Sequence, residues 1–258
     1  MSVWGKVIGS VTGFALGGPL GAILGMIAGH AVDRTQSLGQ GPANDRVFPW
    51  GQSGYAADRE QRQVAFSVAV IVLGAKLAKV DGTVTRAEVN AFKETFHIPP
   101  EAIADVGRIF NEARGEATGF EPYAYQIAEM FAHEPRVLEE LLGGLFHIAK
   151  ADSAVSPAEK TFIRSVAHIF GFDGRTFNRI LASHVGGADE ADPYAVLGLA
   201  RGAGDGDIKK TYRRLIRENH PDVLIAQGMP TEFVAVANEK MAAINAAYDR
   251  IEKERGLR

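Results

Sequence analysis

The feature that most constrains this chain is a run of 26 residues without a charged side chain, from Val7 to Val32. At about 1.5 Å per residue, an α-helix of this length is about 39 Å long. That length crosses a hydrocarbon core of about 30 Å with some tilt. The run therefore predicts an N-terminal transmembrane helix over residues 7–32.

Glycine recurs at every fourth position of this run. The chain has 29 glycines, and 12 of them lie in its first 54 residues, so the excess is local. Residues four apart share one face of a helix, and a face of glycines lets a second helix approach closely, as in transmembrane dimers. The pattern predicts a homodimer through the membrane helix, with a dimer face made of Gly9, Gly13, Gly17, Gly21, Gly25 and Gly29.

Other interpretations of the run are weaker. A cleaved signal peptide has a shorter apolar region of about 7–15 residues and a small-residue cleavage site. A lipoprotein anchor needs a cysteine, and the chain has none. A soluble glycine-rich tail stays open, because glycine and alanine add little hydrophobicity. Lys6 before the run and Arg34 and Arg46 after it give only a weak bias towards a cytoplasmic C-terminal side.

The middle of the chain has helical periodicity. Residues 33–56 mix Gly, Pro, Ser and Gln without periodicity and are predicted to be a linker. Over residues 57–185, apolar side chains such as Val64, Val68 and Ile71 recur at three- and four-residue spacing. About 130 residues suffice for one domain with its own core.

Two stretches of this segment match at an offset of 71 residues, beginning at Ala78 and at Ala149. Each stretch is the end of a helix, an acidic turn and a new helix with a Thr/Ser-x-x-Glu capping box. Two such helix pairs are expected to pack into an all-α bundle. The capping boxes are Thr85 with Glu88 and Ser156 with Glu159.

The helical segment resembles the TerB-like (tellurite-resistance) domain. That resemblance makes the acidic turns candidate metal ligands, namely Asp81, Glu88, Asp152 and Glu159. However, one glutamate of each pair is predicted to cap a helix, and the turn lacks the ligand spacing of a calcium loop. The histidines at 97, 133, 147, 168 and 184 lack the spacing of zinc ligands and are predicted to be packed or surface residues. We therefore predict no metal and no cofactor.

After a short linker at 186–191, residues 192–258 show a new pattern. Asp192 and Pro193 suit the N-cap and first position of a short helix. Residues 208–219 predict a second helix, which ends at His220-Pro221-Asp222 because a proline follows. A long amphipathic helix from about Thr231 to Lys253 is expected to pack against it. The second helix pairs an apolar stripe with basic faces that carry Lys209, Lys210, Arg213, Arg214 and Arg217.

This segment resembles the J-domain. The resemblance rests on four motifs, namely Tyr194-x-x-Leu197-Gly198, the basic run 208–215, His220-Pro221-Asp222, and Ile244-Asn245-x-Ala247-Tyr248. It implies an antiparallel helical hairpin with the His-Pro-Asp tripeptide in the connecting loop. It also implies that the segment stimulates ATP hydrolysis by a DnaK-type seventy-kilodalton chaperone.

Residue chemistry agrees with that partner. The basic helix complements a large acidic ATPase, which favours a fast and oriented encounter. Pro221 fixes the loop backbone. Asp222 can accept a bidentate hydrogen bond from an arginine of the partner, and His220 can hold the loop or the partner's backbone. The predicted partner-binding residues are His220, Pro221, Asp222, Lys209, Lys210, Arg213, Arg214 and Arg217.

As a whole, the chain resembles the DjlA family of membrane-anchored, DnaJ-like co-chaperones of bacteria. This implies a single-pass inner-membrane protein whose bulk faces the cytoplasm, where DnaK resides, and whose TerB-like domain recruits a client or senses a signal. No nucleophile–base constellation or phosphate loop is present, so no catalytic residue and no enzyme activity are predicted. The net charge of −3 argues against a nucleic-acid partner. The alternative is a TerB-type membrane scaffold or a metal- or stress-responsive protein with a non-functional J-domain.

Overall fold

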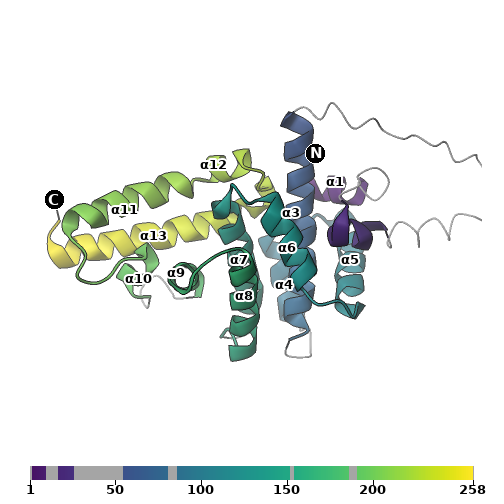
Figure 1. Ribbon diagram of the computed structural model, residues 1–258, viewed down its shortest axis with the longest axis horizontal. Coiled ribbons are helices and arrows are strands. Elements are labelled where there is room, and N and C mark those ends of the chain that lie inside the picture. The colour runs from purple at the N-terminus through teal and green to yellow at the C-terminus, as the bar shows by residue number, and fades with distance from the viewer. Residues whose placement is uncertain are drawn as a thin grey trace, which may run out of the picture.

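The computed structural model describes residues 2–9, 17–25, 55–80, 86–151, 154–185 and 191–257. Within these ranges, every regular element is an α-helix or a short 3-10 helix. This confirms the all-α prediction. Figure 1 shows a bundle of helices from which a long two-helix hairpin projects to one side.

The bundle is built around helix α3, Tyr55–Ala78. Every residue from Val64 to Val72 is fully buried, as a helix that is apolar on all sides requires. Among the described residues, one helical stretch is long and apolar enough to cross a membrane, Asp58–Ala78. Of its most apolar 18 residues, 83% are buried inside the protein. That stretch is the central helix of the bundle. Because α3 begins at Tyr55, it starts inside the predicted linker 33–56.

Six further helices and a 3-10 turn complete the bundle. Helices α7 and α8 form the second of the two matching helix pairs, and the predicted capping box at the start of α8 is present. The Glu159 N–H donates to Ser156 Oγ at 3.2 Å, and the Ser156 N–H donates to Glu159 Oε2 at 2.7 Å. The elements are α4 Arg86–Thr95, η2 Pro100–Ala102, α5 Ile103–Gly115, α6 Glu121–Met130, α7 Pro135–Ala149, α8 Pro157–Ile169 and α9 Gly174–Val185.

The C-terminal part contains a hairpin of two long helices, α11 and α13, with short helices at both ends of α11 (Figure 1). Asp192 caps the first short helix, since its Oδ1 accepts from the Tyr194 N–H at 3.3 Å. That helix ends at Gly198, which has a φ of 71°. The elements are α10 Pro193–Leu197, α11 Asp205–Glu218, α12 Pro221–Ala226, η3 Thr231–Phe233 and α13 Val234–Arg255.

The N-terminal run differs from the single helix predicted for residues 7–32. Helix α1 is Val3–Gly9, and a second helical piece covers residues 18–25. Gly17, just before the second piece, and Gly18, its first residue, have φ of 60° and 57°, outside the α-helical region. The glycine ladder is therefore interrupted here. Gly21 and Gly25 lie in the second piece, while Gly13 and Gly29 lie outside the described residues.

Both N-terminal pieces pack on the bundle. Trp4 is fully buried, its Nε1 donates to the Phe96 carbonyl at 2.9 Å, and the Val3 N–H donates to Glu232 Oε1 at 2.7 Å. The Leu20 N–H donates to Gln126 Oε1 at 2.9 Å. Within the described residues 2–9 and 17–25, five large apolar side chains are buried against protein, namely Trp4, Val7, Leu20, Ile23 and Leu24.

Candidate functional site

The His-Pro-Asp tripeptide lies where the projecting hairpin meets the bundle. The sequence placed it in a loop, but only His220 lies outside a helix, since α12 begins at Pro221. His220 caps that helix, and its Nδ1 accepts from the Asp222 N–H at 3.3 Å. The side chain of His220 is 52% exposed and that of Asp222 is 88% exposed. Both polar groups are thus presented to solvent on a helical backbone.

The tripeptide is held from both sides. On the α11 side, Asn219 is fully buried and its Nδ2 donates to the Leu215 carbonyl at 2.7 Å. On the other side, Leu224 of α12 is fully buried in the apolar core of the bundle. The backbone between them is consequently fixed by two different packing units.

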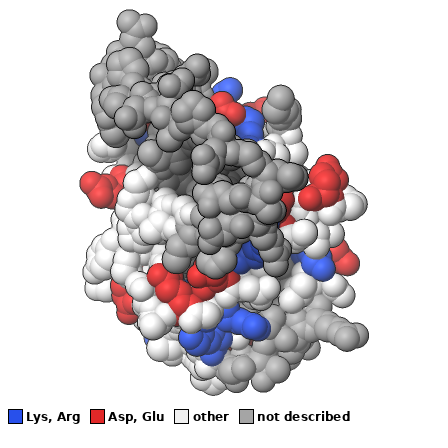
Figure 2. Space-filling model, turned by 90° about the vertical axis from the view of Figure 1, so that its right-hand side faces the viewer, with Lys and Arg blue, Asp and Glu red and all other residues white. Residues whose placement is uncertain are grey.

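The five basic residues predicted for partner binding all lie on α11. Ile208 and Leu215 of this helix are fully buried, while Lys210, Arg213, Arg214 and Arg217 are exposed and Lys209 is half-buried. Arg214 pairs with Glu218 at 3.0 Å. At the opposite end of the molecule, Figure 2 shows acidic and basic side chains interspersed over the described surface. That face therefore does not continue the basic surface of α11.

A stacked tyrosine pair joins α11 to α13. The rings of Tyr212 and Tyr248 lie 4.0 Å apart and nearly parallel, and the Tyr212 hydroxyl donates to Asn245 Oδ1 at 3.0 Å. Both tyrosines are half-buried, whereas Leu215 of α11 is fully buried.

A buried ionic cluster behind the tripeptide was not predicted from the sequence. Lys240 of α13 is fully buried, and its Nζ donates to Glu139 Oε2 at 2.9 Å and to Glu140 Oε1 at 2.7 Å. Glu139 also pairs with Arg179 of α9 at 2.6 Å and with Arg136. Arg136 reaches Glu218, beside the tripeptide, at 2.5 Å. We call these residues the junction cluster: Arg136, Glu139, Glu140, Arg179, Glu218 and Lys240.

One sequence signal could have found the cluster. Two adjacent glutamates, Glu139 and Glu140, stand in the apolar helix α7 between Leu138 and Leu141. Acidic residues at buried helix positions require cationic partners. The signal does not identify Lys240 as that partner, because it lies 100 residues further along the chain.

The two glutamates are in different electrostatic states. Burial alone would raise the pKa of Glu139, but the charges of Lys240, Arg179 and Arg136 outweigh it and hold this pKa well below its usual range. For Glu140, burial dominates over the charge of Lys240 and raises the pKa. Beside them, burial and the charge of Lys240 lower the pKa of His184 to about 3.

The metal alternative gains no support from the described residues. Within the described ranges, no three His, Asp or Glu side chains are grouped so that they could hold a metal ion. Glu159 is engaged in the α8 capping box. Asp81, Asp152 and the side chain of Glu88 lie outside the described residues.

Comparison with known proteins places these features in a family. Three family models match in order: the co-chaperone DjlA transmembrane domain over residues 1–63, tellurite resistance protein TerB over 67–182, and the DnaJ domain over 192–255. A co-chaperone protein DjlA of Shewanella oneidensis is 32% identical, and one of Vibrio parahaemolyticus is 30% identical, each over the full length of both chains. The chain belongs to the DjlA family of co-chaperones.

A further DjlA co-chaperone, from Photobacterium profundum, is 29% identical over 99% of this chain and its own full length. No solved structure matches the chain significantly. Membership of the DjlA family establishes a membrane-anchored protein with a J-domain and a co-chaperone role. Lys240 falls inside the DnaJ-domain match, although its side chain is buried against helices of the TerB match.

Proposed function

We propose that this DjlA-family protein binds a DnaK-type seventy-kilodalton chaperone through the tripeptide and the basic face of α11, and thereby stimulates ATP hydrolysis by that chaperone. The observation that carries the proposal is the exposure of His220 and Asp222 on a fixed backbone, directly after a helix with a basic face. The Asp222 carboxylate, 88% exposed and 3.7 Å from His220 Nδ1 through Oδ2, can accept a charge-assisted hydrogen bond from the partner. The basic face steers the encounter.

The other parts have supporting roles in this proposal. The TerB-like domain, with proposed limits 57–185, recruits a client or senses a signal, and the J-domain occupies 192–258. The hydrolytic chemistry belongs to the partner, so this chain is not itself an enzyme. The chain crosses the bacterial inner membrane once through residues 7–32 and faces the cytoplasm, where DnaK is found. The glycine ladder pairs two such helices in a homodimer.

Stimulation of DnaK ATPase by the full chain tests the first proposal. His220→Gln and Asp222→Asn are expected to leave the ATPase rate at the level of DnaK alone. His168→Gln is the matched control, since His168 is an exposed histidine on α8 of the bundle. If His220→Gln and the unmodified chain give the same ATPase rate, stimulation does not depend on the tripeptide, and the alternative of a scaffold with a non-functional J-domain is favoured.

The proposed topology requires the N-terminus to lie on the other side of the membrane from the bundle. A single crossing places Ser2 on the periplasmic side, and the contacts of Trp4 with Phe96 then cannot form. The absence of cysteine allows a direct test with single introduced cysteines. In intact spheroplasts, a membrane-impermeant maleimide is expected to label Ser2→Cys, but Arg258→Cys only after lysis. Labelling of neither residue before lysis would contradict the single crossing and favour the docked N-terminus.

The dimer is tested by a reporter of self-association in the membrane. Gly17→Leu with Gly21→Leu is expected to abolish association, because leucine closes the groove on the ladder face. Ala22→Leu, one residue off the ladder, serves as the matched control. Association that survives the double substitution would exclude the ladder as the dimer face.

A further inference from the structure

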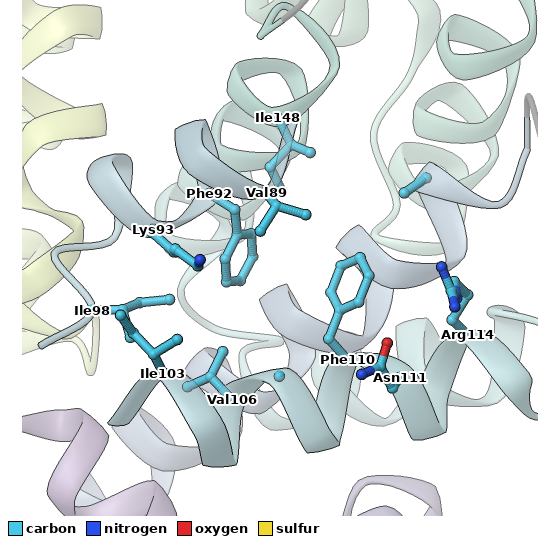
Figure 3. Close-up of a pocket in the computed structure, with 12 residues that line it drawn as sticks. Val89, Phe92, Lys93, Ile98, Ile103, Val106, Phe110, Asn111, Arg114 and Ile148 are labelled. Atoms are coloured by element: carbon cyan, nitrogen blue, oxygen red, sulfur yellow. The ribbon is translucent and has the colours of Figure 1, made fainter. Parts of the chain in front are cut away.

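The TerB-like bundle contains an apolar cavity that the co-chaperone role does not use. It has a volume of about 360 Å³ and lies between the end of α3 and helices α4, α5 and α7 (Figure 3). Its volume is at the lower end of the range of small-molecule sites. Most of its lining is apolar, including Val89, Phe92, Ile98, Val106, Phe110 and Ile148.

One wall of the cavity is left open by a glycine. Gly107 lies in the interior of α5, where glycine destabilises a helix relative to alanine. A Cβ added at Gly107 would meet no atom within 4 Å. No neighbouring group therefore requires glycine at this position, and because Gly107 itself lines the cavity, a larger side chain here has room at the cavity wall. Glycine at position 107 therefore lowers the stability of α5 but places no side chain at this wall of the cavity.

The ends of the cavity are cationic. In Figure 3, the Lys93 amine is turned into the cavity at one end, and Arg114 lies with Asn111 beyond Phe110 at the other. No carboxylate lines the cavity, and neither cation forms a salt bridge within the described part of the chain. Ile103, also in the lining, is 36% exposed and gives the cavity an apolar edge at the surface.

An apolar lining with a cation at each end favours a ligand that has an apolar chain and an anionic group. We propose that the cavity binds the alkyl chain of a medium-chain fatty acid, whose carboxylate pairs with Lys93. A peptide would bring backbone N–H and C=O groups into a lining that offers them one amide, Asn111, and burying such groups without partners is costly. An alkyl chain has no such groups, and its single anionic end matches the cationic lining. The membrane anchor holds the site near a source of acyl chains.

Photo-crosslinking of the full chain in phosphatidylcholine nanodiscs tests the proposal. A diazirine-tagged dodecanoate is expected to label peptides of α4 and α5, and unlabelled dodecanoate is expected to compete. Gly107→Leu fills the cavity and is expected to reduce this labelling about tenfold. Gly107→Ala, which adds one methyl group, is the matched control and is expected to retain most of it. Labelling of peptides from residues 7–32 reports partition into the bilayer and is expected to stay constant in every variant.

A second pair of variants tests the carboxylate. Lys93→Gln is expected to reduce labelling about threefold to tenfold, whereas Lys160→Gln, the same change on α8, leaves it unchanged. Labelling of α4 and α5 that is insensitive to Gly107→Leu overturns the site, provided that thermal unfolding shows the variant to be folded. Equal labelling by a dodecanol analogue overturns the role of Lys93. Competition by an apolar peptide but not by dodecanoate overturns the fatty acid and identifies a client site.

Discussion

The described part of the chain has two apolar clusters, one in the hairpin and one in the bundle, and helix α13 joins them. The hairpin cluster is built from α10, α11 and the second half of α13, with Tyr194, Leu215, Ile244 and Ile251 among its buried residues. The bundle cluster contains the core of the TerB-like helices. It also contains residues that follow the His-Pro-Asp tripeptide, namely Leu224, Met229, Phe233, Val236 and Ala237.

The stretch matched by the DnaJ-domain family is therefore not one packing unit. Helix α13, of 22 residues, begins in the bundle and ends in the hairpin, with Lys240 of the junction cluster near the point of change. Because α13 is one continuous helix, it holds α11, which packs on its second half, in a fixed orientation relative to the bundle. The tripeptide at the end of α11 therefore has a fixed position relative to the bundle. Because α13 begins in the bundle cluster and ends in the hairpin cluster, unfolding of the two clusters is expected to have unequal consequences. The hairpin can open while the bundle stays folded, but loss of the bundle removes one end of α13.

The largest effect is expected from Lys240→Met. This change leaves Glu140 buried without its cation, and breaking a buried ion pair in this way costs about 3–5 kcal/mol in the free energy of unfolding. Lys253→Met, at the exposed end of α13, is the control and is expected to change stability by less than about 0.5 kcal/mol. Urea unfolding measures both. Adding Glu140→Leu to Lys240→Met is expected to recover part of the loss, and no recovery would contradict the pairing.

A matched pair of truncations tests the asymmetry. Phe233 is 1% exposed, with ring centroids 4.8 Å from Phe66 and 4.6 Å from Phe96, and Phe233→Ala is expected to cost about 3–5 kcal/mol. Ile251→Ala in the hairpin is expected to cost about 2–5 kcal/mol. In hydrogen exchange, Phe233→Ala is expected to speed exchange in both α3 and α11, and Ile251→Ala in α11 alone. Equal effects of the two variants on α3 would show that the clusters open together.

The features that could be predicted from the sequence are those set by neighbours along the chain. The Asp192 cap, the Ser156–Glu159 capping box and the stripe of α11 depend on spacings of two to eight residues. The position of the tripeptide at the end of a basic helix followed in the same way. These local patterns decided the fold class and the candidate partner-binding site.

The features that could not be predicted depend on long-range contacts. Helical periodicity places Phe233 and Ile251 on one face of the long helix predicted from about Thr231 to Lys253, but it does not show that Phe233 packs on the bundle and Ile251 on α11. Lys240 resembles any helical lysine until Glu140 is placed beside it. At Gly17 the period of four suits a helix, yet glycine also accepts the positive φ that interrupts one.

Acid is expected to weaken the bundle side of the junction through His184. Burial lowers its pKa from an ordinary value of 6.5 to about 3, so the folded chain keeps the ring neutral where the unfolded chain binds a proton. The stability from neutral His184 is complete above about pH 6.5 and is lost as the pH falls towards about 3, by at most about 1.4 kcal/mol per pH unit. His184→Gln is expected to flatten this part of the stability profile in urea unfolding. An unchanged slope between pH 6 and pH 4 would contradict the burial of a neutral ring.

Arg136→Ala is expected to have the smallest effect on stability. It also tests most directly whether the contact between the bundle and α11 affects the partner-binding site. Glu139 keeps Arg179 and Lys240 in this variant, so no buried charge is left unpaired, and the cost is expected to be about 1 kcal/mol. Glu218 keeps its contact with Arg214 within α11 but loses its contact with Arg136 of the bundle, which loosens the end of α11 beside His220. If the proposed DnaK interaction is correct, the concentration for half-maximal ATPase stimulation rises while maximal stimulation is retained. Arg108→Ala, which removes an exposed pair with Asp105 on α5, is the control. A double-mutant cycle with Glu218→Gln assigns the effect, because a contribution from the contact itself makes the two substitutions non-additive in both stability and half-maximal concentration.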